Sequence, residues 1–208
     1  MSDPLQPIEP YRRHWIEYAA TLVGLVVAVI SLWVAIATER ANQKMVDANY
    51  RMVAAASWPF LQIDSGNDDN GTNRITLELQ NAGVGPAKVQ SFEVFWRGKA
   101  YTSSAALLRA CCTNDKTTTF QTGTLPVLGV VLRAGDQRQF FRFDLTPDNK
   151  DIWKAFDRVR QRELSYRACY CSVFDECWIS PLSSAQSRHT LEVQPVKACP
   201  TPVAPWEQ

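Results

Sequence analysis

The chain has 208 residues, with 22 basic and 21 acidic side chains and a formal net charge of +1. Neither half is strongly basic, so the charge pattern excludes the electrostatic footprint of a nucleic-acid-binding protein. Only two histidines are present, His14 and His189, which leaves few candidates for acid–base or metal chemistry.

Residues 15–38 are predicted to form a transmembrane helix, preceded by a short N-terminal tail at 1–14. The last 21 residues of this segment carry no charged side chain. At about 1.5 Å per residue they span about 30 Å, which matches the hydrocarbon core of a bilayer. The alternative is a cleaved signal peptide with a small-x-small site at Ala35-Ile36-Ala37. The length of the apolar run, with Glu17 in front of it, favours a retained anchor in contact with membrane lipid.

The orientation of this helix is predicted from the cysteines. Basic residues lie on both sides of the segment, so the positive-inside rule does not decide. All six cysteines follow the segment, and disulfides persist mainly in oxidising compartments. We therefore expect a single-pass protein of the bacterial inner membrane with its large domain in the periplasm. In a cytosolic domain the same residues would be free or buried thiols.

Small side chains recur along one face of the predicted membrane helix, at Ala20, Gly24, Ala28, Ser31 and Ala35. Such a face lets two helices approach closely in lipid, where dispersion forces drive packing. It predicts self-association of the chain. The alternative is that alanine and glycine are simply common in membrane helices.

Residues 39–57 contain neither glycine nor proline and are predicted to continue the helix as a stalk. Alanine and methionine recur there at alternating spacings of four and three, like the a/d seam of a coiled coil. Two heptads of mostly small residues make a weak seam. Packing of the stalk against its own domain is an equal alternative.

Residues 58–195 have the pattern of a β domain, in which short runs of alternating apolar residues are separated by turn residues. We expect strands near residues 60–63, 75–79, 87–97, 141–145, 166–173 and 177–180, and a last strand marked by Leu191 and Val193 and ended by Pro195. The apolar phase changes within the third strand, which predicts a β-bulge near Ser91.

Two short helices are expected at 103–112 and 148–162. The second has an apolar stripe formed by Ile152, Ala155, Phe156 and Val159. Short antiparallel strands with few helices predict a mainly β fold, either a two-sheet sandwich or an open barrel. Residues 196–208 are rich in proline and are predicted to form an extended, irregular C-terminal tail.

The turn between the second and third strands runs Asn81-Ala82-Gly83-Val84-Gly85-Pro86-Ala87. We interpret it as structural, with Asn81 bonding back to the turn and Pro86 fixing the entry to the next strand. The two glycines, Gly83 and Gly85, can adopt positive φ there. A phosphate-binding loop is the functional alternative, but it needs a helix directly after it, and a strand is expected.

This N-x-G-x-G-P-A turn resembles that of CARDB-type and related immunoglobulin-like β-sandwich modules of bacterial envelope proteins. Together with Trp58-Pro59 and the run Tyr170-Cys171-Ser172-Val173-Phe174-Asp175-Glu176-Cys177-Trp178, it makes the chain similar to a set of single-pass membrane proteins of proteobacteria. The resemblance covers most of the chain through short motifs. It implies an immunoglobulin-like sandwich and an envelope location, and it brings no catalytic residue.

The cysteines suggest a disulfide framework, although six cysteines allow fifteen pairings. Cys171 and Cys177 flank a tight turn and can face each other across a hairpin. Cys169 shares a strand face with Cys171. Cys199 can join the proline-rich tail to the body of the domain.

The remaining pair, Cys111 and Cys112, is adjacent in sequence, so we expect each to bond to another cysteine. A zinc site is the main alternative for the cysteines, but their spacings are C-C and C-x-C and no histidine lies nearby. A thiol–disulfide enzyme would show C-x-x-C at a helix start. The acidic run at 64–71 lacks EF-hand spacing and is expected to be a solvated loop. We therefore predict no metal and no cofactor.

Aromatic side chains gather around the expected hairpin and form a candidate recognition patch of Tyr166, Tyr170, Phe174 and Trp178. Exposed aromatics anchor protein interfaces. The alternative is that these rings pack into the core and the sheet edge.

These features favour a non-catalytic, membrane-anchored binding module whose partner is another protein or a second copy of the chain. We expect it to bind through an exposed edge strand or the aromatic hairpin. The alternative is a structural subunit that oligomerises through its membrane helix and stalk. An envelope enzyme is the third hypothesis, but no G-x-S-x-G sequence, P-loop or metal-binding helix motif supports it.

Overall fold

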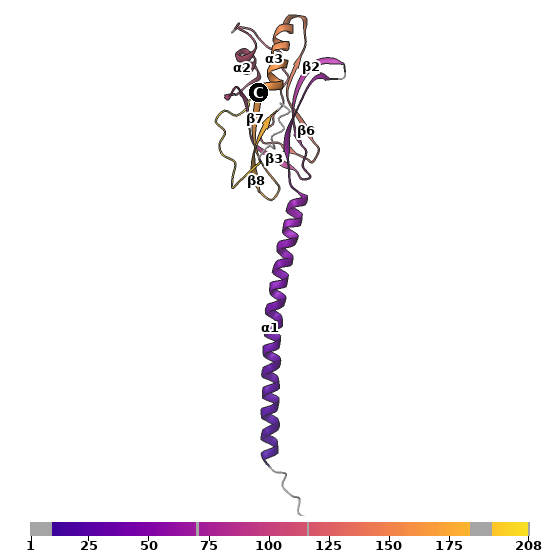
Figure 1. Ribbon diagram of the computed structural model, residues 1–208, viewed down its shortest axis with the longest axis vertical. Coiled ribbons are helices and arrows are strands. Elements are labelled where there is room, and N and C mark those ends of the chain that lie inside the picture. Colours follow the sequence, from indigo (N-terminus) through magenta and orange to yellow (C-terminus); the bar gives the residue numbers. More distant parts are fainter. Residues whose placement is uncertain (1–9, 70, 116, 184–192, 208) are drawn as a thin grey trace, which may run out of the picture. The chain divides into compact units, whose positions relative to one another are not determined.

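The computed structural model describes residues 10–69, 71–115, 117–183 and 193–207. The chain forms two compact units, Met1–Val53 and Ala54–Gln208. The described part of the first unit is helical, and the second unit contains the strands and the shorter helices (Figure 1).

Helix α1 (Pro10–Ala56) runs without a break through the predicted membrane segment and the predicted stalk. The stretch Trp15–Ala56 is long and apolar enough to cross a bilayer, and no other helix among the described residues is. None of its most apolar stretch is buried, and such exposure of an apolar surface suits lipid better than water. The small-residue face is exposed throughout, at Ala20, Gly24, Ala28, Ser31 and Ala35.

The described residues of the second unit form two sheets. The smaller sheet has the order β1-β2-β6, with β1 (Leu61–Asp69), β2 (Thr72–Asn81) and β6 (Gln137–Asp144). The larger sheet has the order β4-β3-β7-β8-β9, and β5 also pairs with β3. Its strands are β3 (Ala87–Trp96), β4 (Lys99–Tyr101), β5 (Val131–Leu132), β7 (Leu164–Cys171), β8 (Cys177–Ser183) and β9 (Gln194–Val196). These pairings are all antiparallel, as predicted.

The bulge predicted in β3 is present. The register of β3 against β7 shifts between Val89 and Ser91. Val89 is buried before the shift, and Phe92 and Val94 are buried after it. The extra residue therefore allows both apolar sets of the strand to reach the same core.

The two sheets share one hydrophobic core. At its centre the ring centroid of Phe140 in β6 lies 4.8 Å from that of Phe92 in β3 and 5.9 Å from that of Tyr166 in β7. The register of β6 against β2 shifts beside Leu77, so the adjacent residues Phe140 and Phe141 are both buried. The alternating pattern of this strand predicted that only Phe141 of the two would be buried.

Both predicted short helices form. The first is α2 (Ser104–Cys111), and the second is a 3-10 turn η1 (Pro147–Asn149) followed by α3 (Lys150–Arg162). The hydroxyl of Ser103 caps α2 by accepting a hydrogen bond from the N–H of Ala106. This satisfies one of the backbone donors that a helix start leaves open.

Helix α3 buries Phe156 and Val159, as its apolar stripe predicted, and also Trp153 and Arg160. The guanidinium of Arg160 donates to the hydroxyl of Ser65 at 2.7 Å, which fastens α3 to β1. Its charge is balanced within the helix by Asp157, whose Oδ1 lies 2.6 Å from Nη2 of Arg160.

The acidic run 64–71, expected as a solvated loop, instead forms the end of β1. Residues as far as Asp69 pair with β2, with Ser65 opposite Leu77 and Gly66 opposite Thr76. Hydrogen bonding along this long hairpin overrides the turn preference of aspartate, asparagine and glycine. Strand β1 therefore extends to Asp69, and β2 begins at Thr72.

The last strand also differs from the prediction. Pro195, expected to end a strand, lies within β9 opposite Trp178. A proline is tolerated at the edge of a sheet, where its missing N–H faces away from the neighbouring strand, and β9 stands last in the order of its sheet. Val193 directly precedes β9, and Leu191 lies outside the described residues.

The C-terminal segment, defined here as residues 197–207, belongs to the second unit. Its backbone is irregular, as its prolines predicted. The N–H of Trp206 donates to the carbonyl of Phe92 at 2.9 Å. The side chain of Trp206 is only 2% exposed, and its ring centroid lies 6.3 Å from that of Phe140. The domain therefore extends through Trp206, beyond the boundary expected at residue 195.

Candidate functional site

The turn predicted to be structural is organised by the fully buried side chain of Asn81. Its Oδ1 accepts from the N–H of Phe60 at 3.2 Å and from the N–H of Gly83 at 3.1 Å. Its Nδ2 donates to the carbonyl of Gly85 at 2.8 Å and to the two carbonyls of residues 132–133 at 3.1 Å. Asn81 therefore joins the turn to two other segments, so its role is structural.

The two glycines of this turn are required by close packing, and the expectation of positive φ is wrong. Neither Gly83 nor Gly85 has positive φ. A Cβ atom on Gly83 would lie 2.3 Å from the backbone nitrogen of Phe60, and one on Gly85 would lie 1.8 Å from the carbonyl oxygen of Ser57. Strand β3 begins directly after Pro86, so the helix start that a phosphate loop needs does not follow this turn.

The candidate recognition patch is not an exposed surface. Tyr166 and Tyr170 are buried in the shared core, and burial raises the pKa of the Tyr170 phenol to about 12. Trp178 is partly buried, with its ring centroid 6.0 Å from that of Tyr170. Of the four residues, only Phe174, at the β7–β8 turn, is exposed, with 40% of its surface accessible to solvent. Alternate residues of a strand share a face, and for the two tyrosines that face is the interior.

The disulfide expected across the hairpin is present, and Cys199 joins the C-terminal segment to the domain, through a partner that the sequence did not identify. Cys171 is joined to Cys177 across the β7–β8 hairpin. Cys169 is joined to Cys199, which attaches the C-terminal segment to β7. Because Cys169 and Cys171 alternate with the buried tyrosines of β7, both disulfides lie on the face of the larger sheet that points away from the core.

The third disulfide overturns a prediction. Cys111 and Cys112 are joined to each other, with their Cα atoms 3.7 Å apart. They lie at the end of α2, where Cys112 has left helical geometry with φ −132° and ψ −3°. Departure from the helix at this residue brings two adjacent side chains together, which regular secondary structure does not allow.

The C-terminal segment crosses the outward face of the larger sheet and is held at three points. The first is the disulfide between Cys199 and Cys169. The second is the carboxylate of Glu93, whose Oε1 accepts from the two N–H groups of residues 203–204 at 3.0 and 3.2 Å. The third is the indole of Trp206 in the core. Together these contacts make the segment a fixed part of the domain surface.

The second attachment point depends on an ion pair. Glu93 is 2% exposed, and its Oε2 accepts from Nε of Arg167 at 2.7 Å and lies 2.6 Å from its Nη2. The two residues are directly opposite on β3 and β7. A buried carboxylate needs compensation of this kind. The Arg167 side chain is 45% exposed, and its guanidinium carbon also lies 5.3 Å from the ring centroid of Phe95.

A cleft of about 440 Å³ lies beside this ion pair, between the C-terminal segment and the sheet. Its apolar lining includes Ile179, Pro181 and Val203, and its polar lining includes Ser91, Arg167 and Gln194. The volume falls within the usual range of ligand sites. Apolar walls beside the partly exposed side chain of Arg167 can bury an apolar group and pair with an anionic one. This cleft is the candidate functional site.

Sequence reasoning missed this site. Glu93 and Arg167 occur in strands predicted from the sequence, but their pairing depends on the register of β3 against β7. The signal that was present is the opposite charge of two residues in strands expected to lie in one domain.

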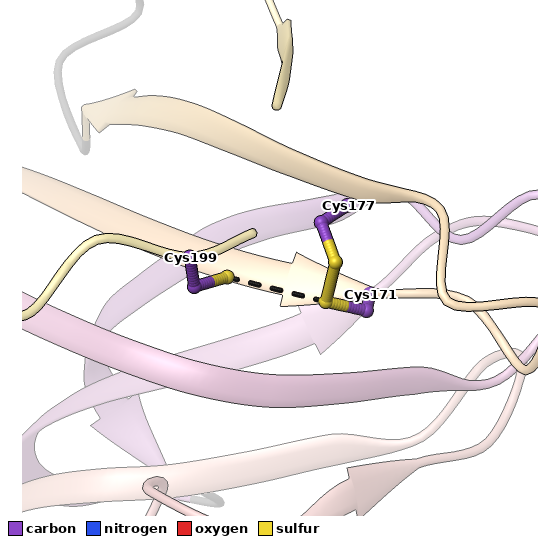
Figure 2. A group of neighbouring side chains, drawn as sticks. All are labelled: Cys171, Cys177 and Cys199. Atoms are coloured by element: carbon purple, nitrogen blue, oxygen red, sulfur yellow. Dashed lines mark hydrogen bonds between the residues drawn. A yellow bond between two sulfur atoms is a disulfide. The ribbon is translucent and has the colours of Figure 1, made fainter. Parts of the chain in front are cut away.

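The sulfur atoms of Cys171, Cys177 and Cys199 lie within 4.8 Å of one another, the spacing of a possible metal site. In this structure each of them belongs to a disulfide, as Figure 2 shows for Cys171 and Cys177. Metal ions are bound by thiolates, so the group is a pair of neighbouring disulfides and not a metal centre in this state.

No protein-family model, curated protein or solved structure matches the chain. The comparisons therefore assign no family to the chain.

Proposed function

We propose that this chain is a non-catalytic binding protein anchored in the bacterial inner membrane by residues 15–38, with its β-rich domain in the periplasm. The exposed apolar stretch of α1 supports the anchor. The pairing of all six cysteines in disulfides supports an oxidising compartment.

The second unit is proposed to be an immunoglobulin-like β-sandwich, as the resemblance to CARDB-type modules implies. The antiparallel pairing within both sheets and the core they share support this assignment. The contact between Phe92 and Phe140 joins one strand of each sheet, which is the kind of packing that two facing sheets make.

The cleft beneath the C-terminal segment carries the binding proposal. Ile179 and Pro181 provide apolar walls, and Arg167, whose side chain is 45% exposed, provides a cation. Gln194 of the edge strand β9 borders the same cleft, and an extended chain can add to the edge of a sheet. The partner that fits these features is an extended protein segment with an acidic side chain at Arg167.

Photo-crosslinking in intact bacteria tests this proposal. A p-benzoylphenylalanine in place of Pro181, an exposed residue of the cleft, should form an ultraviolet-dependent adduct with another protein. The variant Arg167→Gln should reduce this adduct about tenfold, because a charge-assisted contact to the partner is lost. Glutamine can still donate a hydrogen bond to Glu93, so the C-terminal segment should stay attached.

Matched controls lie on the smaller sheet. The same crosslinker in place of Gln137, exposed on β6, should give no adduct, and Arg138→Gln should leave the adduct at residue 181 unchanged. Equal adducts at both positions, or none at residue 181, would contradict this binding mode. Trypsin added to spheroplasts does not cross the inner membrane and should cut the exposed stalk at Arg40, Lys44 or Arg51; an uncut stalk would contradict the periplasmic location.

Self-association through α1 is the second candidate function. A Cβ atom on Gly24 would meet nothing within 4 Å, so this point of the small-residue face is open to a second helix. In a membrane two-hybrid assay of the full chain, Gly24→Leu should abolish the signal if the helices pack there. Val23→Leu, at an exposed neighbour outside the small-residue face, is the control. An unchanged signal in the Gly24 variant would exclude this interface.

A further inference from the structure

Two disulfides lie side by side on the outward face of β7. Cys169 and Cys171 are two residues apart on this strand, so their side chains share a face. The first is joined to Cys199 of the C-terminal segment and the second to Cys177 of β8. Figure 2 shows Sγ of Cys199 pointing toward Sγ of Cys171, and the two atoms are 4.0 Å apart.

This contact joins sulfur atoms of two different disulfides. Neither atom carries a hydrogen while both bonds are intact, so the contact is between sulfurs alone. Thiol–disulfide exchange needs a thiolate beside a disulfide sulfur. Opening either bond at Cys171 or Cys199 creates that arrangement without a large movement of β7, since the sulfur of Cys177 also lies within 4.8 Å of both.

We propose that Cys169, Cys171, Cys177 and Cys199 form one exchange cluster. Opening of the Cys169–Cys199 disulfide by an external dithiol reductant lets the second disulfide move to Cys171–Cys199. The cluster thus has a chemistry of its own, although it lacks the C-x-x-C spacing of a thiol–disulfide enzyme. This inference does not depend on the binding function proposed above.

Cys199 is the point of entry, because it is partly exposed whereas Cys169 is buried. One thiolate of the reductant bonds to Sγ of Cys199, and Cys169 leaves as a thiolate. The second thiolate of the reductant then attacks the reductant's own sulfur in this mixed disulfide. The reductant leaves as a cyclic disulfide, having supplied two electrons, and Cys199 becomes a thiolate.

The exchange itself is redox-neutral within the protein. The Cys199 thiolate attacks Sγ of Cys171, and the Cys171–Cys199 bond forms as the Cys171–Cys177 bond breaks. Cys177 leaves as a thiolate, and it and Cys169 take up protons from water. After the exchange, the four cysteines of the cluster hold one disulfide and two thiols, as they did before it.

This exchange changes how the C-terminal segment is attached. Its covalent link moves two residues along β7, from Cys169 to Cys171, and the β7–β8 turn loses its crosslink. Cys169 is part of the lining of the cleft, so a free thiol there alters the floor of the cleft. The cluster therefore links the redox state of the domain to the shape of the candidate site.

Mapping of disulfides in the full chain tests the proposal, with the protein in detergent micelles at pH 8. In Cys177→Ser the thiol of Cys171 is left 4.0 Å from Cys199. We expect at least about a tenth of the chains to carry Cys171–Cys199 with a free Cys169 thiol, because a thiolate beside a disulfide exchanges readily with it. After acid quenching and alkylation, chymotryptic cleavage after Tyr170 separates Cys169 from Cys171 for mass spectrometry.

The unsubstituted chain gives an independent measurement. Among chains reduced by dithiothreitol to two thiols that keep the Cys111–Cys112 disulfide, the Cys171–Cys199 link should appear with alkylated Cys169 and Cys177. The control, Cys112→Ser, frees the Cys111 thiol and should leave both pairings of the cluster unchanged. Recovery of only Cys169–Cys199 in Cys177→Ser, together with no Cys171–Cys199 link in the partly reduced chain, would overturn the proposal.

Discussion

Replacing Trp206 by alanine should lower the free energy of unfolding of the β-rich domain by about 3–5 kcal/mol. The indole is almost fully buried and packs against Phe140 at the centre of the core. Its removal leaves a large cavity, and the main-chain bond from Trp206 to Phe92 loses the packing that holds it in place. Urea unfolding of the full chain in detergent micelles, followed by near-ultraviolet circular dichroism, measures the change.

The matched control for this substitution is Trp58→Ala. Trp58 is 42% exposed, so the loss of its side chain should cost about 1 kcal/mol or less. Equal stabilities for the two variants would show that the C-terminal segment is not part of the folded core.

The second large effect is expected at Gly85. Gly85→Ala should lower the free energy of unfolding by about 3 kcal/mol or more, at the upper end for overpacking. The added Cβ would lie 1.8 Å from the carbonyl oxygen of Ser57, a backbone atom that cannot rotate away. The turn must then separate from the segment that follows α1, and the bonds from Val84 and Gly85 to the carbonyl of Trp58 are lost. The same urea unfolding experiment measures the change.

Gly66→Ala is the control for the added methyl group. Gly66 lies in β1, and a Cβ atom there would make an ordinary contact of 3.5 Å with Oγ1 of Thr76. We expect its stability to change by less than about 1 kcal/mol. A Gly85 variant as stable as the Gly66 variant would refute the close packing of this turn.

The turn at Asn81 shows how far the sequence predicts structure here. The motif correctly indicated a turn in which Asn81 bonds back to the main chain. It did not reveal that the same side chain reaches residues 132–133, or that Ser57 approaches Gly85. Local chemistry predicts a turn, whereas contacts between distant segments depend on how the whole chain folds.

The cysteines show a similar difference between what the local sequence predicts and what depends on the folded chain. The hairpin pair Cys171–Cys177 followed from a local turn, and Cys199 was correctly expected to attach the C-terminal segment. The link between Cys111 and Cys112 was missed, because it depends on the backbone leaving helical geometry between adjacent residues.

Strand alternation has a limit of its own. It puts Tyr166 and Tyr170, four residues apart, on one face of a strand, and in the structure both are buried. It could not tell which face points inward, because both faces of β7 carry apolar or sulfur-containing side chains. The cleft at Arg167 was missed for a related reason, since its roof comes from a segment that the proline pattern marked only as irregular.

The position of Trp206 in the core has a consequence for biogenesis. The described strands of this domain are all made before Trp206, the residue that fills the space next to Phe140 and Phe92. A nascent chain that has emerged only as far as β9 still has an open, wettable interior and an unpaired Cys169. The domain therefore completes its folding late in synthesis, and until then it presents the kind of surface that chaperones bind.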